Sequence, residues 1–347
     1  MRILPVVATL LLVSACVQED PSRETISLTG STMGTTYTVK AIKGDAPITA
    51  DELQFEVQEA LKDVNDKMSN WVKTSEVERF NRSQSTEWTP ISADFSAVLG
   101  EAFTIHEEST GRFDVTLAPL IDLWGFGPSE DQPSRPSDEK IAQALESVGM
   151  QTKLEYRNSP PALRKVNPET TVNLSAIAKG YGVDKVAATL EFNGIQEYLV
   201  EIGGDLITKG NNASNVPWVV GIEKPDTARQ TVQEVIQLKD KALATSGDYR
   251  NYKEVDGRRL SHILDPVTGL PIEHKLASVT VIAESATRAD GLATAIYALG
   301  DARGMHLALI KDLPIFMIIR EGDSFVEKAS PAFKALQNQH STDEGTS

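Results

Sequence analysis

Hydrophobic residues recur at helical spacing in several segments of the chain. From Leu53 to Met68, apolar side chains lie three or four residues apart, directly after the capping-box sequence TADE. This arrangement predicts a helix that ends near Ser69. The same reasoning predicts further helices at 92–111, 137–149, 174–194 and 285–300, with Ser92 as the cap of the first of them. The last of these is apolar on nearly every side, which is typical of a helix buried in a core.

Runs rich in Val, Ile and Thr lie between these helices and predict strands. They occupy 26–42, 197–204, 217–223, 231–238, 241–247, 276–284 and 313–320. Strands and helices do not alternate strictly, which favours an α+β or mixed α/β fold with an antiparallel-rich sheet and helices packed on it. We expect a single large domain over 28–335, with two lobes as an open alternative, and a polar C-terminal tail at 336–347.

The first residues have the pattern of an export signal. One arginine precedes an apolar run from Ile3 to Val13 that is too short to span a bilayer. The run ends in the letters VSAC, which resemble a bacterial lipoprotein cleavage box. We therefore expect a signal peptide at 1–15, a lipid on Cys16 and a flexible tether at 16–27. An ordinary secretory peptide is the alternative.

Composition and charge restrict the function further. The chain has 347 residues, of which 40% are hydrophobic, enough for a sizeable core. Cys16 is its only cysteine, which excludes structural disulfides and cysteine-based metal sites. The formal net charge of −15 excludes nucleic-acid binding through a general basic field and adsorption to anionic lipid by charge. Any link to a membrane would therefore depend on the lipid.

A carboxylate in the apolar helix is the first candidate for chemistry. Asp290 and Thr294 lie four residues apart and share one face of the predicted helix. A buried carboxylate requires a cation or several hydrogen-bond donors. Pairing with an Arg or Lys, or capping of a nearby backbone, would satisfy it. Oxygen ligands from Asp and Thr would also suit Mg²⁺ better than zinc.

Two glycines in the predicted helix at 174–194 are a second unusual feature. Each glycine costs about 1 kcal/mol relative to alanine in a helix interior, so Gly180 and Gly182 suggest close approach of another backbone or of a ligand. Asn173 and Ser175 precede this helix, and a helix N-terminus favours phosphate. Tight helix–sheet packing is the alternative. The GGD turn after the strand at 197–204 and the GFGP turn after Trp124 are weaker signals, and no P-loop or dinucleotide-binding glycine motif is present.

His262 and Asp265 surround a short apolar pair before a Pro-Gly turn. Residues three apart on a strand point to opposite faces. The two side chains therefore need not touch, and the spacing alone does not make a catalytic pair.

Together these segments resemble the bacterial FAD:protein FMN transferases, the ApbE-type flavin transferases. The resemblance runs from about Leu28 to about Phe333 and is specific, because many blocks occur in the same order. The blocks are GSTMGTTY, MSNW, GRFDVTLAPLIDLWGFGP, NLSAIAKGYGVDKVA, YLVEIGGDL, TSGDYRNY, SHILDPVTGLPI and ATRADGLATA.

The resemblance implies roles for individual residues. The residues expected to contact FAD are Met33, Trp71, Arg112, Phe113, Asp114, Asn173, Lys179 and Leu264. The implied Mg²⁺ ligands are Asp290, Thr294 and the carbonyl of Ala176. His262 and Asp265 would lie near the reacting phosphate, with His262 preferred as the base. The chain departs from some relatives, which carry an acidic residue in place of Lys179, an additional Asp in place of Ala293 and often Tyr in place of Trp71.

The activity implied is Mg²⁺-dependent transfer of the FMN part of FAD to a Thr or Ser hydroxyl of an acceptor protein, with release of AMP. The implied acceptors are subunits of membrane redox complexes that carry a short Thr/Ser motif. The location would be the periplasmic side of the cell membrane, preferably the inner membrane, through the lipid anchor. Two alternatives remain: a FAD pyrophosphatase that uses water as acceptor, and a non-catalytic lipoprotein that binds flavin or metal.

Overall fold

The computed structural model describes residues 23–127, 135–225, 232–248, 252–255, 258–322 and 324–343. The predicted signal peptide and Cys16 lie outside these residues. Within these ranges, no helix has the length and hydrophobicity that crossing a bilayer requires.

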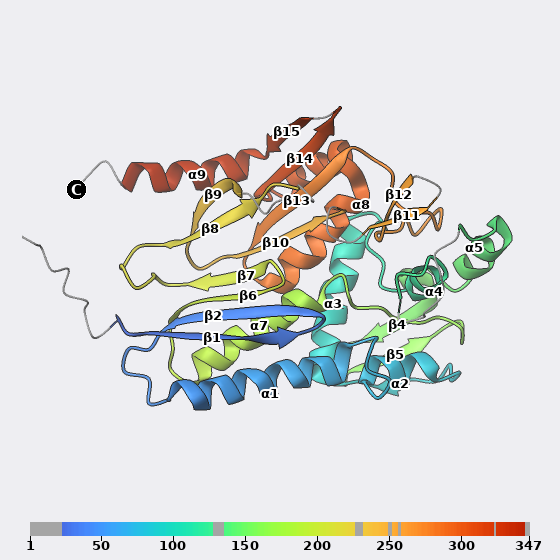
Figure 1. The fold of residues 1–347 in the computed structure, drawn as a ribbon. Coiled ribbons are helices and arrows are strands. Elements are labelled where there is room, and N and C mark those ends of the chain that lie inside the picture. The colour runs from blue at the N-terminus through green and yellow to red at the C-terminus, as the bar shows by residue number, and fades with distance from the viewer. Residues whose placement is uncertain are drawn as a thin grey trace, which may run out of the picture.

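An eight-stranded sheet forms the centre of the molecule (Figure 1). Its strand order is β1-β2-β6-β7-β10-β13-β14-β15, and every neighbouring pair is antiparallel. The strands are β1 (Thr25–Thr32), β2 (Thr35–Ile42), β6 (Glu197–Ile202), β7 (Asp205–Lys209), β10 (Ala242–Gly247), β13 (Leu276–Ala283), β14 (Ile315–Glu321) and β15 (Ser324–Ala329). The predicted α+β architecture is confirmed. The strand predicted at 26–42 is a hairpin, because Met33 and Gly34 take positive φ angles of 49° and 74°.

A layer of four long helices lies on one face of this sheet (Figure 1); three of them pack on its strands, and the helix at 93–108 packs on the other helices. They are α1 (Ala50–Met68), α3 (Ala93–Glu108), α7 (Ala178–Phe192) and α8 (Ala286–Ile310). The side chains of Thr49 and Ser92 cap α1 and α3, as the sequence predicts. α7 begins at Ala178, later than predicted, because 175–177 form a turn. The helical backbone of α8 is interrupted at its predicted end, Gly300, where φ is 77° and ψ is 175°, and a second helical stretch continues to Ile310.

A hairpin and the last helix cover the opposite face. β8 (Trp218–Glu223) pairs with β9 (Val232–Leu238) in a separate two-stranded sheet. Together with α9 (Pro331–Asp343) these strands bury a second apolar cluster against the large sheet, made by residues such as Leu243, Ile282 and Phe316. The large sheet is therefore sandwiched between two unequal layers.

Smaller elements complete the fold beside the helical layer. They are α2 (Glu76–Arg82), β3 (Thr89–Pro90), α4 (Ala118–Leu123), α5 (Asp138–Leu145), α6 (Met150–Lys153), β4 (Leu154–Arg157), β5 (Ala162–Lys165), β11 (Tyr252–Val255) and β12 (Arg258–Ser261). Leu264 packs with Leu120, Trp124 and Ile141 in a third apolar cluster. This cluster fixes the segment that follows β12 against α4 and α5.

Candidate active site

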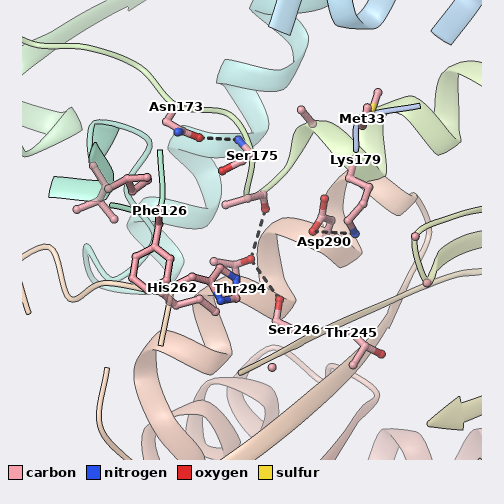
Figure 2. Close-up of a pocket in the computed structure, with 18 of the residues that line it drawn as sticks. Met33, Phe126, Asn173, Ser175, Lys179, Thr245, Ser246, His262, Asp290 and Thr294 are labelled. Carbon is pink, nitrogen blue, oxygen red and sulfur yellow. Dashed lines mark hydrogen bonds and ion pairs between the residues drawn. The ribbon is translucent and has the colours of Figure 1, made fainter. Parts of the chain in front are cut away.

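A cavity of about 750 Å³ lies where the long helices meet the ends of several strands. Each predicted site residue that the structure describes lines it, with one exception, Asp265. The lining residues come from the β1–β2 turn, the end of α1 and α8, and from segments at 112–117, 121–127, 173–179, 203–206, 221–223, 243–247 and 262–264. Segments far apart in the sequence therefore converge on one space, and Figure 2 shows part of it.

The proposed metal ligands lie together in this cavity. Asp290 and Thr294 project from one face of α8, as predicted. The Thr294 hydroxyl lies 3.5 Å from the Ala176 carbonyl oxygen and 3.3 Å from the Ser246 hydroxyl (Figure 2). These neutral oxygens, with one carboxylate, are hard ligands of the kind that Mg²⁺ prefers. Among the described residues no group of three His, Cys, Asp or Glu side chains is arranged to hold a metal ion, so an ion here would depend on this mixed oxygen set.

Glycine 180 brings α7 into contact with α8 at this point. A Cβ atom on Gly180 would lie 2.1 Å from the carbonyl oxygen of Ala286, so no larger residue fits without moving backbone. The Gly180 N–H donates a hydrogen bond of 2.9 Å to Asp290. A Cβ on Gly182 would meet the end of the Met33 side chain at 2.7 Å. The prediction of close backbone approach is therefore confirmed at Gly180, whereas Gly182 accommodates a side chain.

Lys179 brings a cation to the same place. Its ammonium group forms an ion pair with Asp205, which is almost fully buried, and lies 3.9 Å from the second oxygen of Asp290. Asp205 begins β7 directly after the Gly203–Gly204 turn, and its other oxygen is 3.4 Å from the Thr245 N–H. The buried Asp290 carboxylate thus has both a backbone donor and a nearby lysine, as a buried carboxylate requires.

Asp265 lies outside the cavity because its two oxygens are used elsewhere. One pairs with Arg112, and the other accepts a hydrogen bond of 2.8 Å from the Val267 N–H. The Gly269 N–H donates to the Asp265 carbonyl at 2.8 Å, which closes the predicted Pro-Gly turn. Asp265 therefore positions Arg112, a cavity residue, and stabilises the turn.

His262 directly follows β12 and lines the cavity. Its ring meets the edge of the Phe126 ring, with 6.4 Å between centroids and an interplanar angle of 65°. The segment beyond it is held in place by the isolated bridge between Leu264 and Pro271 and by a 2.8 Å hydrogen bond from the Trp124 indole to Gly269. The histidine therefore lines the cavity and Asp265 does not, although both lie beyond the end of β12, where the alternation of strand faces does not apply.

The acidic and aromatic residues at 113–114 have mainly buried contacts. Asp114 accepts hydrogen bonds from the N–H groups of Thr116, at 2.7 Å, and Met150, at 2.9 Å. The Phe113 carbonyl accepts one of 2.7 Å from His106 Nδ1. These bonds fix the shape of the segment that carries Arg112 into the cavity.

A pair of asparagines holds the segment that leads to Ala176. The side-chain amides of Asn70 and Asn81 each donate 2.9 Å hydrogen bonds to the Val172 carbonyl. Asn81 also accepts from the Val172 N–H at 2.7 Å. Asn173, one residue on, accepts from the Ser175 N–H at 2.9 Å (Figure 2). Asn70 lies in the MSNW block, next to Trp71 at the cavity rim, yet its spacing gave no reason to select it.

Some lining residues were not selected from the sequence. Phe126 lies in the GFGP turn, which is a weak signal in the sequence; it packs against the third apolar cluster and also lines the cavity. Gly203 and Gly204 line the cavity as well, although the GGD turn was only a weak signal. Ser246 was not selected, because nothing local marks a strand serine that faces a site. The glycine pairs in the GGD and GFGP turns are the sequence feature that could have indicated these lining residues.

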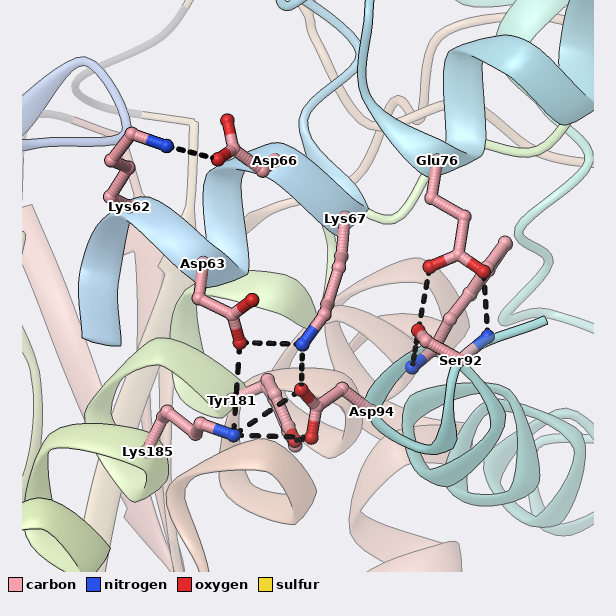
Figure 3. Close-up of polar contacts among 10 residues, drawn as sticks. Lys62, Asp63, Asp66, Lys67, Glu76, Ser92, Asp94, Tyr181 and Lys185 are labelled. Carbon is pink, nitrogen blue, oxygen red and sulfur yellow. Dashed lines mark hydrogen bonds and ion pairs between the residues drawn. The ribbon is translucent and has the colours of Figure 1, made fainter. Parts of the chain in front are cut away.

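A polar cluster behind the cavity fixes the end of α1 (Figure 3). Lys67 of α1 and Lys185 of α7 both pair with Asp94 at the start of α3, and the Tyr181 hydroxyl donates to Asp94 at 2.6 Å. Burial alone would raise the pKa of Asp94, but the hydrogen bonds from Lys67, Tyr181 and Lys185 outweigh it and hold the pKa well below its usual range. The cluster fixes the C-terminal end of α1, which is followed closely in the chain by Trp71 at the cavity rim.

Comparison with known proteins gives a consistent result. The model of the ApbE family matches residues 33–317. The chain is 44% identical over 327 residues to a FAD:protein FMN transferase of Vibrio cholerae serotype O1, which covers 94% of this chain and 96% of that protein. It is 43% identical over 335 residues to a FAD:protein FMN transferase of Haemophilus influenzae, with 95% and 96% covered. The solved structure of the flavin transferase ApbE from Vibrio cholerae has a TM-score of 0.84 at 43% identity, covering 90% of this chain and 99% of that chain. The chain therefore belongs to the ApbE family.

Proposed function

We propose that this protein transfers the FMN part of FAD to a Thr or Ser hydroxyl of an acceptor protein and releases AMP. Relatives that match nearly the whole chain at 43–44% identity are named FAD:protein FMN transferases. The observation that carries the proposal is the single cavity in which His262, Lys179 and the Asp290–Thr294 pair meet. At about 750 Å³ the cavity is in the upper part of the range for small-molecule sites and suits a ligand as large as a dinucleotide.

The chain would bind FAD through groups of different kinds. The exposed Trp71 ring at the rim offers a surface on which a flavin or adenine ring stacks. Arg112, held by Asp265, and Lys179, held by Asp205, offer cations to the diphosphate. Met33, Phe113, Asp114, Asn173 and Leu264 would shape the remaining walls.

In the proposed reaction, the acceptor hydroxyl oxygen attacks the phosphorus on the FMN side of the diphosphate. A new P–O bond forms to the acceptor, and the bond from that phosphorus to the bridging oxygen breaks, so that AMP leaves with the bridging oxygen. His262 accepts the hydroxyl proton, because it lines the cavity and imidazole is suited to proton transfer near neutral pH. Asp265 acts indirectly by positioning Arg112.

A divalent ion, for which we propose Mg²⁺, fits the oxygen set in the cavity. Asp290, Thr294 and the Ala176 carbonyl would hold it, and when bound it would neutralise negative charge on the phosphates and leaving group. The protein's own contribution is to keep these oxygens in one place through the Gly180 contact between α7 and α8.

A labelling assay tests the proposal. The protein is incubated with FAD, Mg²⁺ and a candidate acceptor, with and without EDTA, and the acceptor is checked for flavin fluorescence on a denaturing gel. A fluorescent acceptor band that EDTA removes is expected. Free FMN and AMP without a labelled acceptor would instead show a pyrophosphatase, and no turnover with any divalent ion would show a binding protein.

We further propose that the mature chain begins at a lipidated Cys16 and that 16–27 tethers a transferase domain at 28–335 to the periplasmic side of the cell membrane, with the inner membrane preferred. The acceptors would be subunits of membrane redox complexes at the same surface. The VSAC sequence and the single cysteine support this. Cys16→Ser should move the protein from the membrane fraction to the soluble fraction while transfer to a soluble acceptor is kept. A variant that stays in the membrane fraction would contradict the anchor.

A further inference from the structure

The ion pair between Lys179 and Asp205 places an ammonium group beside the proposed metal ligands. The Lys179 ammonium lies 3.9 Å from an oxygen of Asp290, the only carboxylate in the ligand set. A lysine at this distance is itself a suitable partner for that carboxylate. It therefore competes with a divalent ion for Asp290 unless another group holds it.

Asp205 is that other group. It is 1% exposed and pairs with Lys179 more closely than Asp290 does. It does not itself line the cavity, although Gly204 and Leu206 on either side of it do. Its second oxygen faces the Thr245 N–H of β10, so its position is fixed by the sheet rather than by the ligand site.

We infer that Asp205 is a positioning residue that keeps Lys179 away from Asp290, so that Asp290 stays available to a divalent ion. The buried carboxylate cancels the lysine charge next to the ion site. The Lys179 ammonium group can still donate hydrogen bonds to a phosphate, while the pair as a whole does not lower the affinity of the site for a metal ion. This inference rests on the proposed divalent-ion site and extends it to a residue outside the cavity wall.

The charges on the three side chains predict how the variants behave. In Asp205→Asn, Lys179 loses its partner and moves to Asp290, so metal binding weakens. In Lys179→Met, the competing cation is gone, so metal binding is unchanged or tighter. In the double variant both charges are absent, so metal affinity returns to near that of the wild type, because a paired charge replaced as a whole leaves no uncompensated group.

The experiment is a double-mutant cycle on metal binding alone, without FAD or acceptor. Free Mn²⁺ is followed by electron paramagnetic resonance during titration of the full chain, and Mg²⁺ competition gives the affinity for Mg²⁺. We expect Asp205→Asn to weaken Mn²⁺ binding about tenfold or more, and the double variant to bind within about threefold of the wild type. The matched control is Asp301→Asn, which removes an Asp from a surface pair with Lys328 and should leave Mn²⁺ affinity unchanged.

The outcomes separate the possibilities. Equal weakening by Asp205→Asn in the presence and absence of Lys179 would mean that Asp205 acts on the ion through its own charge, and the inference would be wrong. Unchanged Mn²⁺ affinity in Asp205→Asn would also overturn it, while leaving the transferase proposal intact. A wild-type chain that binds no divalent ion would overturn both the ion site and the inference. Thermal melting and circular dichroism of all variants establish that each titration reports on folded protein.

Discussion

Helix α7 contributes lysines to two charged regions that differ in how completely their charges are satisfied. In the cluster behind the cavity, Asp94 is contacted by Lys67, Lys185 and Tyr181, all within 3.2 Å. In the cavity, Asp290 accepts one short hydrogen bond, of 2.9 Å from the Gly180 N–H, and has its lysine at 3.9 Å. The Thr294 hydroxyl has long contacts, of 3.3 and 3.5 Å, among the described residues. In the first region the Asp94 carboxylate has close partners for its oxygens, and these contacts hold α1, α3 and α7 together. The second leaves oxygens with bonding capacity for a ligand.

The largest expected effect is on the rate of flavin transfer, when the negative charge of Asp290 is removed from the cavity. Asp290→Asn keeps an oxygen that accepts from the Gly180 N–H, so the fold should survive, but it removes the one carboxylate of the proposed ion site. We expect transfer to fall about 100-fold or more, as is usual when an electrostatic contribution to the transition state is lost. The measurement is the initial rate of acceptor labelling at saturating Mg²⁺. A variant that labels at the wild-type rate would place the ion elsewhere.

The next largest effect is on stability and concerns the contact between α7 and α8 at Gly180, which forms part of the cavity wall. Gly180→Ala should destabilise the protein by about 3 kcal/mol, because the added methyl group meets the Ala286 backbone of α8. Gly182→Ala is the matched control on the same helix, since its methyl group meets the flexible end of Met33 and makes an ordinary contact with Ile202 at 3.4 Å, rather than meeting backbone, and alanine favours the helix. Denaturant unfolding of both variants measures the difference. Equal stabilities would show that α8 can shift without cost.

A smaller effect is expected from the saturated cluster. Asp94→Asn should lower the free energy of unfolding at pH 7 by about 1 kcal/mol, a modest value because the cluster is partly solvated. The folded-state pKa of Asp94 is depressed, so its stabilisation is present above the unfolded pKa of about 3.9 and is lost as pH falls below it.

The stability difference between the wild type and Asp94→Asn should therefore be full above about pH 5 and should shrink progressively as pH falls through the unfolded pKa towards the folded-state pKa, which lies well below it. Unfolding curves at several pH values test this, and labelling by the folded variant should stay close to wild type. A stability difference that did not shrink at all as pH fell from about 5 to about 2 would mean that the charge of Asp94 is not its source.

The smallest effect is expected at the rim. Trp71 is 68% exposed, so stacking there is partly solvated. Trp71→Ala should weaken FAD binding about fivefold, while Trp71→Phe, which keeps a ring, should stay within about twofold. Fluorescence titration with FAD under metal-free conditions measures both. Equal losses in the two variants would indicate that the indole makes a polar contact rather than a stack.

The sequence by itself determined the features that depend on near neighbours. The caps at Thr49 and Ser92 and the shared face of Asp290 and Thr294 follow from spacings within one or two helical turns. Local backbone geometry fixes these relations whatever the rest of the chain does. The eight blocks added the family and the site residues, because their order along the chain is specific.

Only the tertiary structure decided which distant groups meet. Arg112 and Asp265 are separated by 153 positions, and Thr294 and the Ala176 carbonyl by 118. Neither the pairing of Lys179 with Asp205 nor the turn of Asp265 out of the cavity is encoded in a local pattern. The physical reason is that such contacts depend on how helices and strands pack, and packing is the joint outcome of the whole buried core rather than of any one segment.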